Sequence, residues 1–361
     1  MSLVLSSVRD TLYAVTSCCF PNPTLHINRR TFKVIKLLGE GGFSYVHLVQ
    51  DTSTGRYYAL KKIRCQFGTD SVKDAMKEVD MYRLFSHENI IKVIDTCVVQ
   101  DKNGGKIVYI FLPYYKSGLQ DVINNNLENN KYFSEKEMLK IFRGICYAVR
   151  ALHTYRFPSV PLRSENGITN SNLNGIENEM NNSISLQSNN SQNEDGVVPF
   201  AHRDIKPGNI LLTDDADSQP ILMDFGSLVR ARIKIQTRNE ALMQQDLASQ
   251  HSTMSYRAPE LFDVKTNVEL NEKVDIWSLG CTLYAMAYGS SPFDNNINEQ
   301  GGSIALAVLN AQFRFPPTEQ DKYSPEFKDL ISFMLKVDPK DRPDIHQVIA
   351  KVDTQLEQLS S

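Results

Sequence analysis

Hydrophobic and polar residues alternate in the first part of the chain with the period of two that is typical of strands. Residues 32–37 and 45–49 alternate in this way, and glycines at 39, 41 and 42 interrupt the pattern between them. A third such stretch, 57–63, follows the turn sequence at 51–55. We therefore expect a small antiparallel sheet with a glycine-rich turn between its first two strands.

A helical period of apolar residues replaces this alternation further along. The sequences at 71–74 and 134–137 are capping boxes, and each precedes a stretch with one apolar face. The second stretch, 138–152, is expected to form the core of a mainly helical region. An apolar strand is expected at 107–112, and Pro113 begins a connection after it. The order of elements predicts an α+β fold with a sheet-rich first part and a helical second part.

The composition changes between residues 163 and 199. This segment is rich in Asn and Ser, contains no aromatic residue and, after Arg163, contains no Lys or Arg. Such a segment buries too little apolar surface to offset its ordering entropy, so we predict a disordered Asn-rich insertion over 158–199. The alternative is a loop that docks a partner or is phosphorylated.

The charge and the cysteines exclude several classes of protein. Lys and Arg number 39 against 42 Asp and Glu, a formal net charge of −3, so nucleic acid is not expected as a partner. There is no CxxC pair, which argues against a zinc site or a disulfide framework and favours reduced thiols in the cytosol. No apolar run is long enough to span a bilayer or to form a secretory core, so we expect neither a transmembrane span nor secretion. The six cysteines are at positions 18, 19, 65, 97, 146 and 281.

The glycine-rich turn has the chemistry of a phosphate cradle. Glycines let the backbone approach phosphate closely and turn its N–H groups toward negative charge. Ser44 departs from the GxGxxG pattern, but its N–H can still donate, so nucleotide binding is expected. Lys61 on the third strand and Glu78 on the following helix are expected to pair and to direct the ammonium group toward phosphates. The alternative is a lysine that reaches solvent beside an unrelated acid.

The segment 202–209, followed by Asp224-Phe225-Gly226, places two acids, an amide and a lysine at the spacings of a phosphotransfer loop. Asp204 is the candidate for the group that accepts and aligns a substrate hydroxyl proton. Lys206 can neutralise charge on a transferring phosphate. Asn209 and Asp224 carry the hard oxygen ligands that suit Mg²⁺.

Other residues around this loop are expected to support it. His202 is expected to brace the loop by packing and hydrogen bonding, and Asp275 to bind its backbone. Arg203 is expected to pair either with a phosphorylated residue or with a neighbouring acid. Arg342 is placed to pair with Glu260. The helix-prone stretch 239–247 is expected to shape a substrate groove.

These motifs, together with Ala258-Pro259-Glu260 and the sequence at 275–280, make the chain from about residue 31 to 359 resemble a eukaryotic protein kinase. The resemblance implies a bilobal α+β kinase fold that uses ATP and Mg²⁺, with Mn²⁺ as an alternative metal. Lys206 and Thr253 resemble the serine/threonine class, which implies Ser or Thr acceptors in protein substrates. The alternative is a catalytically weak scaffold that binds nucleotide and recruits partners.

The resemblance also implies domain bounds and an ATP site. A tail at 1–30 would precede an N-lobe at 31–112, a hinge at 113–115 and a C-lobe at 116–359. The residues implied at the ATP site are Leu38, Gly39, Glu40, Gly41, Gly42, Phe43, Ser44, Tyr45, Val46, Ala59, Lys61, Glu78, Leu112, Pro113, Tyr114 and Tyr115.

More narrowly, residues 40–44, 81–85 and 112–115 and the helix-prone stretch resemble the Numb-associated kinases, in particular their small fatty-acylated Golgi or fungal vacuole branch. This implies autophosphorylation and a role in membrane traffic. Cys18 and Cys19 follow an apolar helical face, which is typical of S-acylation and of a peripheral anchor on the cytoplasmic side of an endomembrane. Ser2 stands where a myristoylation signal needs glycine. The alternative is an N-terminal helix docked on the core with two ordinary cysteines.

Overall fold

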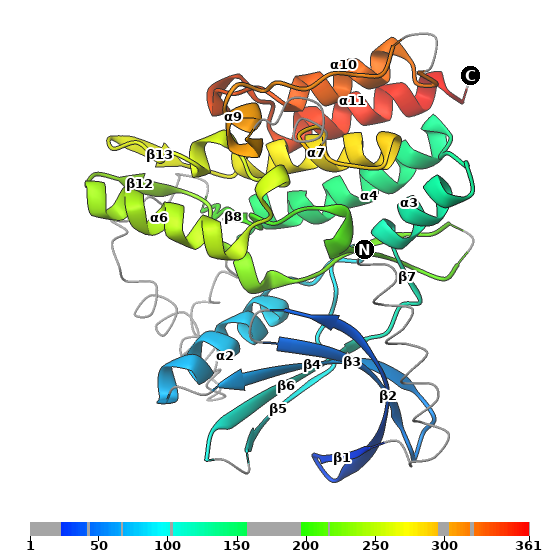
Figure 1. The fold of residues 1–361 in the computed structure, drawn as a ribbon, viewed down its shortest axis with the longest axis vertical. Coiled ribbons are helices and arrows are strands. Elements are labelled where there is room, and N and C mark those ends of the chain that lie inside the picture. Colours follow the sequence, from blue (N-terminus) through cyan, green and yellow to red (C-terminus); the bar gives the residue numbers. More distant parts are fainter. Residues whose placement is uncertain are drawn as a thin grey trace, which may run out of the picture. The chain divides into compact units, whose positions relative to one another are not determined.

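The computed structural model describes eight segments of the chain, residues 23–41, 44–65, 68–101, 104–156, 196–215, 217–294, 303–317 and 321–360. The chain divides into two compact units (Figure 1). Unit 1 comprises Met1–Arg83 and Lys92–Tyr114, and unit 2 comprises Leu84–Ile91 and Tyr115–Ser361. The division after Tyr114 falls within the predicted connection at 113–115.

Unit 1 is built on a six-stranded sheet whose strand order is β1-β2-β3-β4-β6-β5, with every neighbouring pair antiparallel. The strands are β1 Thr24–Ile27, β2 Arg30–Glu40, β3 Ser44–Asp51, β4 Tyr57–Cys65, β5 Asp95–Gln100 and β6 Lys106–Pro113. The alternating stretches at 32–37, 45–49 and 57–63 and the apolar run at 107–112 are confirmed as strands. The short strands β1 and β5 were not predicted.

The two faces of this sheet carry different residues because successive side chains of a strand point to opposite sides. One face holds a buried apolar cluster: Ile27, Phe32, Val34, Val49, Tyr58, Leu60, Ile107, Tyr109 and Phe111. The neighbours of these residues along each strand, such as Ala59 and Lys61, therefore belong to the other face. The alternation in the sequence thus produces a core on one side and leaves the second side for other contacts.

Helix α2, Gly68–Leu84, begins earlier than the sequence indicated. The predicted capping box at 71–74 lies inside the helix, after its first turn, and the Ser71 carbonyl accepts a hydrogen bond from the Cys65 thiol at 3.4 Å. The prediction of the cap was wrong because Ser and Asp three residues apart also occur inside helices, and a local signal does not fix a helix end.

Unit 2 is mainly helical. Its helices are α3 Leu119–Glu128, α4 Glu135–His153, α6 Arg238–His251, α7 Lys273–Tyr288, α9 Ile304–Leu309, α10 Pro325–Met334 and α11 Ile345–Gln358. Helices α4 and α11 pack together, as do α7 and α10 (Figure 1). The capping box predicted for α4 is confirmed, because the Glu137 N–H donates to Ser134 Oγ at 3.2 Å and the Ser134 N–H donates to the Glu137 carboxylate at 3.1 Å.

Short strands in unit 2 hold the connections between its helices. Strands β7 Ser117–Gly118, β9 Ile210–Leu212 and β10 Pro220–Leu222 form one sheet. Two further antiparallel pairs join β8 Phe200–Ala201 to β11 Val229–Arg230 and β12 Ile233–Ile235 to β13 Val268–Leu270. The predicted α+β class is therefore confirmed, with one sheet-rich and one helical unit.

Trp277 anchors the core of unit 2. Its side chain is fully buried in α7 and stacks on Phe293 with ring centroids 5.4 Å apart. The guanidinium carbon of Arg342 lies 5.2 Å from the indole centroid. Burial of one large aromatic ring between α7 and its neighbours confirms that this Trp is a packing residue.

The predicted Asn-rich insertion falls largely outside the described residues, as does the N-terminal tail with Cys18 and Cys19. Its last four residues, 196–199, are described and are hydrogen-bonded. The Val198 N–H donates to the Tyr155 carbonyl at 2.8 Å, and the Ala231 N–H donates to the Pro199 carbonyl at 2.9 Å. The prediction of disorder therefore extended four residues too far, because backbone pairing with distant segments orders residues of low local propensity.

Four of the cysteines lie in the described part of the chain, and Cys65, Cys97, Cys146 and Cys281 are free thiols there. Among the described residues, no group of three or more His, Cys, Asp or Glu could hold a metal ion. Within the described segments, every helix is too short or too polar to cross a bilayer.

Candidate active site

Position 41, between β2 and β3, has little room for a side chain. The Gly41 N–H donates to the Ser44 carbonyl at 2.8 Å, and a Cβ atom at Gly41 would lie 3.0 Å from Ser44 Oγ. A Cβ at Gly39 would meet nothing within 4 Å, so crowding does not require glycine there. Gly42 and Phe43 lie outside the described residues. Glycine at 39 and 41 lets a ligand approach the backbone closely.

Four of the predicted ATP-site residues share the face of the unit 1 sheet that is opposite to its apolar cluster. Val46 is the register partner of Lys61, and Leu112 is the partner of Ala59. Directly paired residues point to the same side, and so do residues two apart on one strand. Tyr45 points to the other side, where the Arg64 guanidinium lies 5.7 Å from its ring centroid. Only the backbone of Tyr45 can therefore serve the predicted site.

The predicted pair of Lys61 and Glu78 is confirmed. Lys61 Nζ lies 2.6 Å from Glu78 Oε1, and the two side chains are only 12% and 10% exposed. Lys61 sits in the middle of β4 between β3 and β6, so the sheet holds its stem while α2 supplies the carboxylate. A lysine that reaches solvent is excluded by this burial. The ammonium group is held in one place by a charge-assisted hydrogen bond.

The catalytic loop, residues 202–209, connects β8 to β9 in unit 2, and Asp275 of α7 binds its backbone. The Asp275 carboxylate accepts hydrogen bonds from the N–H groups of His202 and Arg203, both at 2.8 Å, and contacts His153 Nε2 at 3.0 Å. Burial alone would raise the pKa of Asp275, but these hydrogen bonds and the neighbouring imidazoles lower it below its usual value. A fully buried carboxylate thus fixes the start of the loop.

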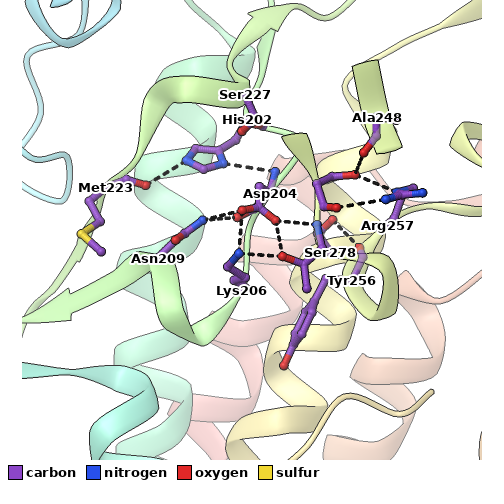
Figure 2. A network of polar contacts seen from close by, with 12 residues as sticks. His202, Asp204, Lys206, Asn209, Met223, Ser227, Ala248, Tyr256, Arg257 and Ser278 are labelled. Carbon is purple, nitrogen blue, oxygen red and sulfur yellow. Dashed lines mark hydrogen bonds and ion pairs between the residues drawn. The ribbon is translucent and has the colours of Figure 1, made fainter. Parts of the chain in front are cut away.

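Asp204 is the centre of a hydrogen-bond network (Figure 2). Its Oδ1 atom accepts from the Thr253 N–H at 2.9 Å and from the Thr253 hydroxyl at 2.8 Å. Its Oδ2 atom accepts from Lys206 Nζ at 2.8 Å and from Asn209 Nδ2 at 2.9 Å. Lys206 Nζ also donates to the Thr253 hydroxyl at 2.6 Å. The structure therefore brings the three predicted catalytic residues together around one threonine hydroxyl.

His202 has the bracing role that its position indicated. Its Nδ1 atom accepts from the Asp204 N–H at 3.3 Å, so Nε2 carries the hydrogen that is donated to the Met223 carbonyl at 3.1 Å (Figure 2). Ser227, which the sequence reasoning did not identify, donates its hydroxyl to the His202 carbonyl at 2.6 Å. These bonds tie the catalytic loop to the segment that contains Asp224.

Asn209 and Asp224 are positioned by neighbouring backbone. The Met223 N–H donates to the Asn209 carbonyl at 3.0 Å, which brings Asn209 beside the residue before Asp224. The Asn209 amide nitrogen donates to the Asp204 carbonyl at 2.7 Å as well as to its carboxylate, so the amide oxygen is left to act as an acceptor. One amide oxygen and one carboxylate fit Mg²⁺, whose remaining ligands come from water and phosphate oxygens.

Two residues of the site have left-handed backbone. Arg203 has φ +66° and Asp224 has φ +67°, a region that non-glycine residues rarely occupy. Each such conformation costs on the order of 1–3 kcal/mol. The bonds of Asp275 to the Arg203 N–H and of Met223 to Asn209 stabilise these turns. The strain lies at the two turns that carry the candidate catalytic and metal-binding acids.

Among the described residues, Arg203 forms no ion pair with an acid. Its Nη1 atom donates to the amide oxygen of Gln244 in α6 at 2.9 Å, while its buried Nε atom has no hydrogen-bond partner. Burial lowers the pKa of this guanidinium to about 10. The expected acid partner was wrong because helix α6 supplies a neutral amide, and pairing with a phosphorylated residue stays a prediction. Nothing in the sequence around Gln244 indicated this contact.

The helix predicted at 239–247 is confirmed as α6. Thr237 caps it, because the Glu240 N–H donates to Thr237 Oγ1 at 3.3 Å and the Thr237 N–H donates to the Glu240 carboxylate at 2.9 Å. Its last residue is His251, and Ser252 then receives a hydrogen bond from Arg257 at 2.8 Å. The helix therefore ends two residues before Thr253, which contacts Asp204.

The predicted pair of Glu260 and Arg342 is confirmed. Both terminal nitrogens of Arg342 lie 2.7 Å from the Glu260 carboxylate oxygens in a two-bond arrangement. Arg342 is fully buried and also donates to three carbonyls, those of Lys336, Lys273 and Val337. This pair anchors the end of the segment that starts at Asp224.

The comparisons with known proteins agree with this geometry. The family model for the protein kinase domain matches residues 32–174 and 195–352. The chain is 38% identical over 350 residues to serine/threonine-protein kinase ppk13 of Schizosaccharomyces pombe, with 97% of each chain covered. It is 33% identical over 359 residues to serine/threonine-protein kinase ENV7 of Saccharomyces cerevisiae, with 94% of this chain and 96% of the relative covered.

A human relative gives the same result. The chain is 34% identical over 337 residues to serine/threonine-protein kinase 16 of Homo sapiens, with 93% of this chain and 94% of the relative covered. Residues 175–194, in the Asn-rich segment, lie between the two ranges that the family model matches. The chain therefore belongs to the protein kinase family and is a serine/threonine protein kinase.

Proposed function

We propose that this kinase transfers the γ-phosphoryl group of Mg²⁺–ATP to Ser or Thr hydroxyls, with Asp204 as the residue that accepts and aligns the hydroxyl proton. The observation that carries the proposal is the Thr253 hydroxyl, which lies 2.8 Å from Asp204 Oδ1 and 2.6 Å from Lys206 Nζ. The same pair of groups can hold the hydroxyl of an acceptor. Such positioning is the main contribution of a protein to phosphoryl transfer.

The other residues of the site would stabilise charge, bind the metal ion and bind the nucleotide. Lys206 carries a positive charge beside the acceptor position, where it can stabilise the charge of the transferring group. Asn209 and Asp224 would hold Mg²⁺, which neutralises charge on the nucleotide phosphates. In unit 1, the Lys61 ammonium, fixed by Glu78, would contact the α- and β-phosphates, and Val46, Ala59 and Leu112 would line the adenine site.

Label transfer tests this proposal. Purified full-length protein with γ-labelled ATP and a generic protein acceptor should transfer label when Mg²⁺ is present, and to itself when no acceptor is added. Chelation of the divalent cation should abolish transfer, and added Mn²⁺ should restore part of it. A well-folded protein that binds nucleotide without any transfer would instead support the alternative of a non-catalytic scaffold.

We further propose that the kinase acts in membrane traffic on the cytoplasmic face of a Golgi or vacuolar membrane, anchored through acylated Cys18 and Cys19. Support comes from the adjacent thiols at the end of an apolar N-terminal stretch and from the family resemblance in the sequence. Two acyl chains, or one chain with an apolar helix face, give stable anchoring where a single chain does not.

Replacement of both thiols tests the anchor. In cells, the Cys18→Ser/Cys19→Ser double variant should move from the membrane to the supernatant fraction, with membrane binding reduced at least tenfold, while label transfer stays unchanged. Neutral hydroxylamine should release the wild-type protein in the same way because it cleaves thioesters. Cys97→Ser, at a thiol on β5, is the control and should leave fractionation unchanged. Unaltered membrane binding of the double variant would refute the anchor.

A further inference from the structure

Helix α6 exposes its large apolar side chains and turns only small or polar ones inward. A surface helix normally buries its large apolar side chains and exposes polar ones. The inner face of α6 carries only small or polar side chains, Ala241, Gln244, Gln245 and Ala248. Its exposed positions include three large apolar side chains, Leu242 at 41%, Met243 at 47% and Leu247 at 39% exposure. Met243 and Leu247 are one turn apart and therefore adjoin, with Leu242 on their flank.

Specific hydrogen bonds hold the helix in this orientation. On the inner face, Gln244 accepts from Arg203 at 2.9 Å. Gln245 donates to the Phe262 carbonyl at 3.2 Å and accepts from the Val264 N–H at 3.2 Å. Rotation of α6 to bury its large apolar side chains would break these bonds and leave Nη1 of the buried Arg203, in addition to Nε, without a hydrogen-bond partner. The exposure of the apolar face is therefore built into the fold of unit 2.

The exposed face continues directly into the acceptor position. Thr253, whose hydroxyl touches Asp204, follows the helix end by two residues, and the next residue, Met254, is 46% exposed. Leu247 and Met243 lie about 6 and 12 Å before His251 along a helix that rises about 1.5 Å per residue, and the extended residues Ser252 and Thr253 add a few ångströms to each distance. An extended peptide covers the same distance in about three to five residues.

We propose that the outer face of α6, formed by Leu242, Met243 and Leu247, is a docking surface for the protein substrate. It would bind a large apolar side chain, such as Leu, Ile, Met or Phe, that lies three to five residues from the phosphorylated Ser or Thr. A substrate hydroxyl at Asp204 brings one flank of the substrate within reach of this face. The residues of α6 include one Arg and no Lys, so the helix lacks the positive charge that an anionic membrane would attract.

This proposal deepens the proposed function and rests on it, and a peptide array separates the two. The full-length kinase is given a library of peptides with one fixed Ser or Thr and one fixed residue at each flanking position in turn. We expect a preference of at least fivefold for large apolar residues over Gln at one position three to five residues from the acceptor. Absence of transfer to every peptide would contradict the proposed function. Transfer without any apolar preference at these positions would contradict only the docking surface.

Variants of the helix test the assignment to residues. Gln has a helix propensity close to those of Met and Leu, so Met243→Gln/Leu247→Gln should leave α6 intact. For the selected peptide, the double variant should raise KM about tenfold with little change in kcat, and it should not affect a peptide that carries Gln at the selected position. Leu359→Gln is the matched control, because Leu359 is 41% exposed, close to Leu247 at 39%, and is the C-cap residue of α11, a helix that Figure 1 shows apart from α6.

The remaining outcomes also decide the proposal. Circular dichroism and thermal melting must show that the double variant is folded. If this variant keeps the apolar preference and KM of the wild type, the docking surface is refuted. If it instead turns a dimer into a monomer in size-exclusion chromatography while peptide selection is unchanged, a second copy of the chain covers the face, and the substrate proposal is again refuted.

Discussion

Asp204→Asn should lower kcat by about two to four orders of magnitude, the usual contribution of a positioned proton acceptor. The asparagine side chain has the same shape, but it removes the negative charge that receives Lys206 Nζ at 2.8 Å and Asn209 Nδ2 at 2.9 Å. The amide of the asparagine has one oxygen and one NH2 group. Whichever way it is turned, the NH2 group faces donors, either those of Lys206 and Asn209 or those of Thr253. The acceptor hydroxyl loses its alignment, while unit 1 and its Lys61–Glu78 pair stay unchanged.

Initial rates and nucleotide titrations separate these effects. The variant should bind ATP with the affinity of the wild type, and its melting temperature should differ by no more than a few degrees. Asp329→Asn makes the same chemical change at an exposed acid of α10, which pairs with Lys351 on the surface, and it should leave kcat unchanged. An Asp204 variant with more than a tenth of the wild-type kcat would contradict the assigned role.

Arg342→Ala should destabilise unit 2 by about 3–5 kcal/mol, which is typical when one partner of a buried ion pair is removed. The guanidinium is fully buried, pairs with Glu260 at 2.7 Å and donates to the carbonyls of Lys336, Lys273 and Val337. The alanine leaves these four acceptors without a donor and opens a cavity next to the indole of Trp277.

Trp277 reports this unfolding because it is the only tryptophan of the chain and is fully buried. Its fluorescence during urea titration should show a midpoint about 1–2 M lower for Arg342→Ala than for the wild type. Glu260→Gln keeps the volume of the pair and the three hydrogen bonds from Arg342 to carbonyls, so this variant should lose less stability than Arg342→Ala. Lys351→Ala removes a surface pair and should change the midpoint little. Equal midpoints for Arg342→Ala and the wild type would show that the pair does not anchor the fold.

Helices and strands were predicted best where the hydrophobic period, the capping residues and the length of the stretch all indicated the same element. Strands β2, β3, β4 and β6 alternate clearly or are continuously apolar, and α4 combines a capping box with a long apolar face. Strand β1 has only four residues, and β5, with the sequence Asp-Thr-Cys-Val-Val-Gln, does not alternate. The start of α2 was placed too late because a capping-box pattern also occurs inside the helix.

The candidate site was predicted where a motif gives the spacing of its residues. Asp204, Lys206 and Asn209 lie within six residues of one another, and their contacts follow from the short loop that carries them. Motif positions also predicted two long-range pairs, Lys61 with Glu78 and Glu260 with Arg342.

Contacts outside any motif could not be predicted. Gln244 reaches Arg203 because α6 packs beside the catalytic loop, and Ser227 reaches the His202 carbonyl because a turn brings it there. Both contacts depend on tertiary packing between segments at least 25 residues apart. The exposed apolar side chains of α6 could not be predicted for the same reason. Which side of the helix is exposed depends on tertiary packing and is known only from the structure.

Phosphoamino-acid analysis of a protein acceptor labelled by the purified full-length kinase tests the central claim most directly. With Mg²⁺ and γ-labelled ATP, the label should appear on Ser or Thr, and the Asp204→Asn protein, prepared and folded in the same way, should produce almost none. Label confined to Tyr, or equal labelling by the wild type and the Asp204→Asn variant, would contradict the account.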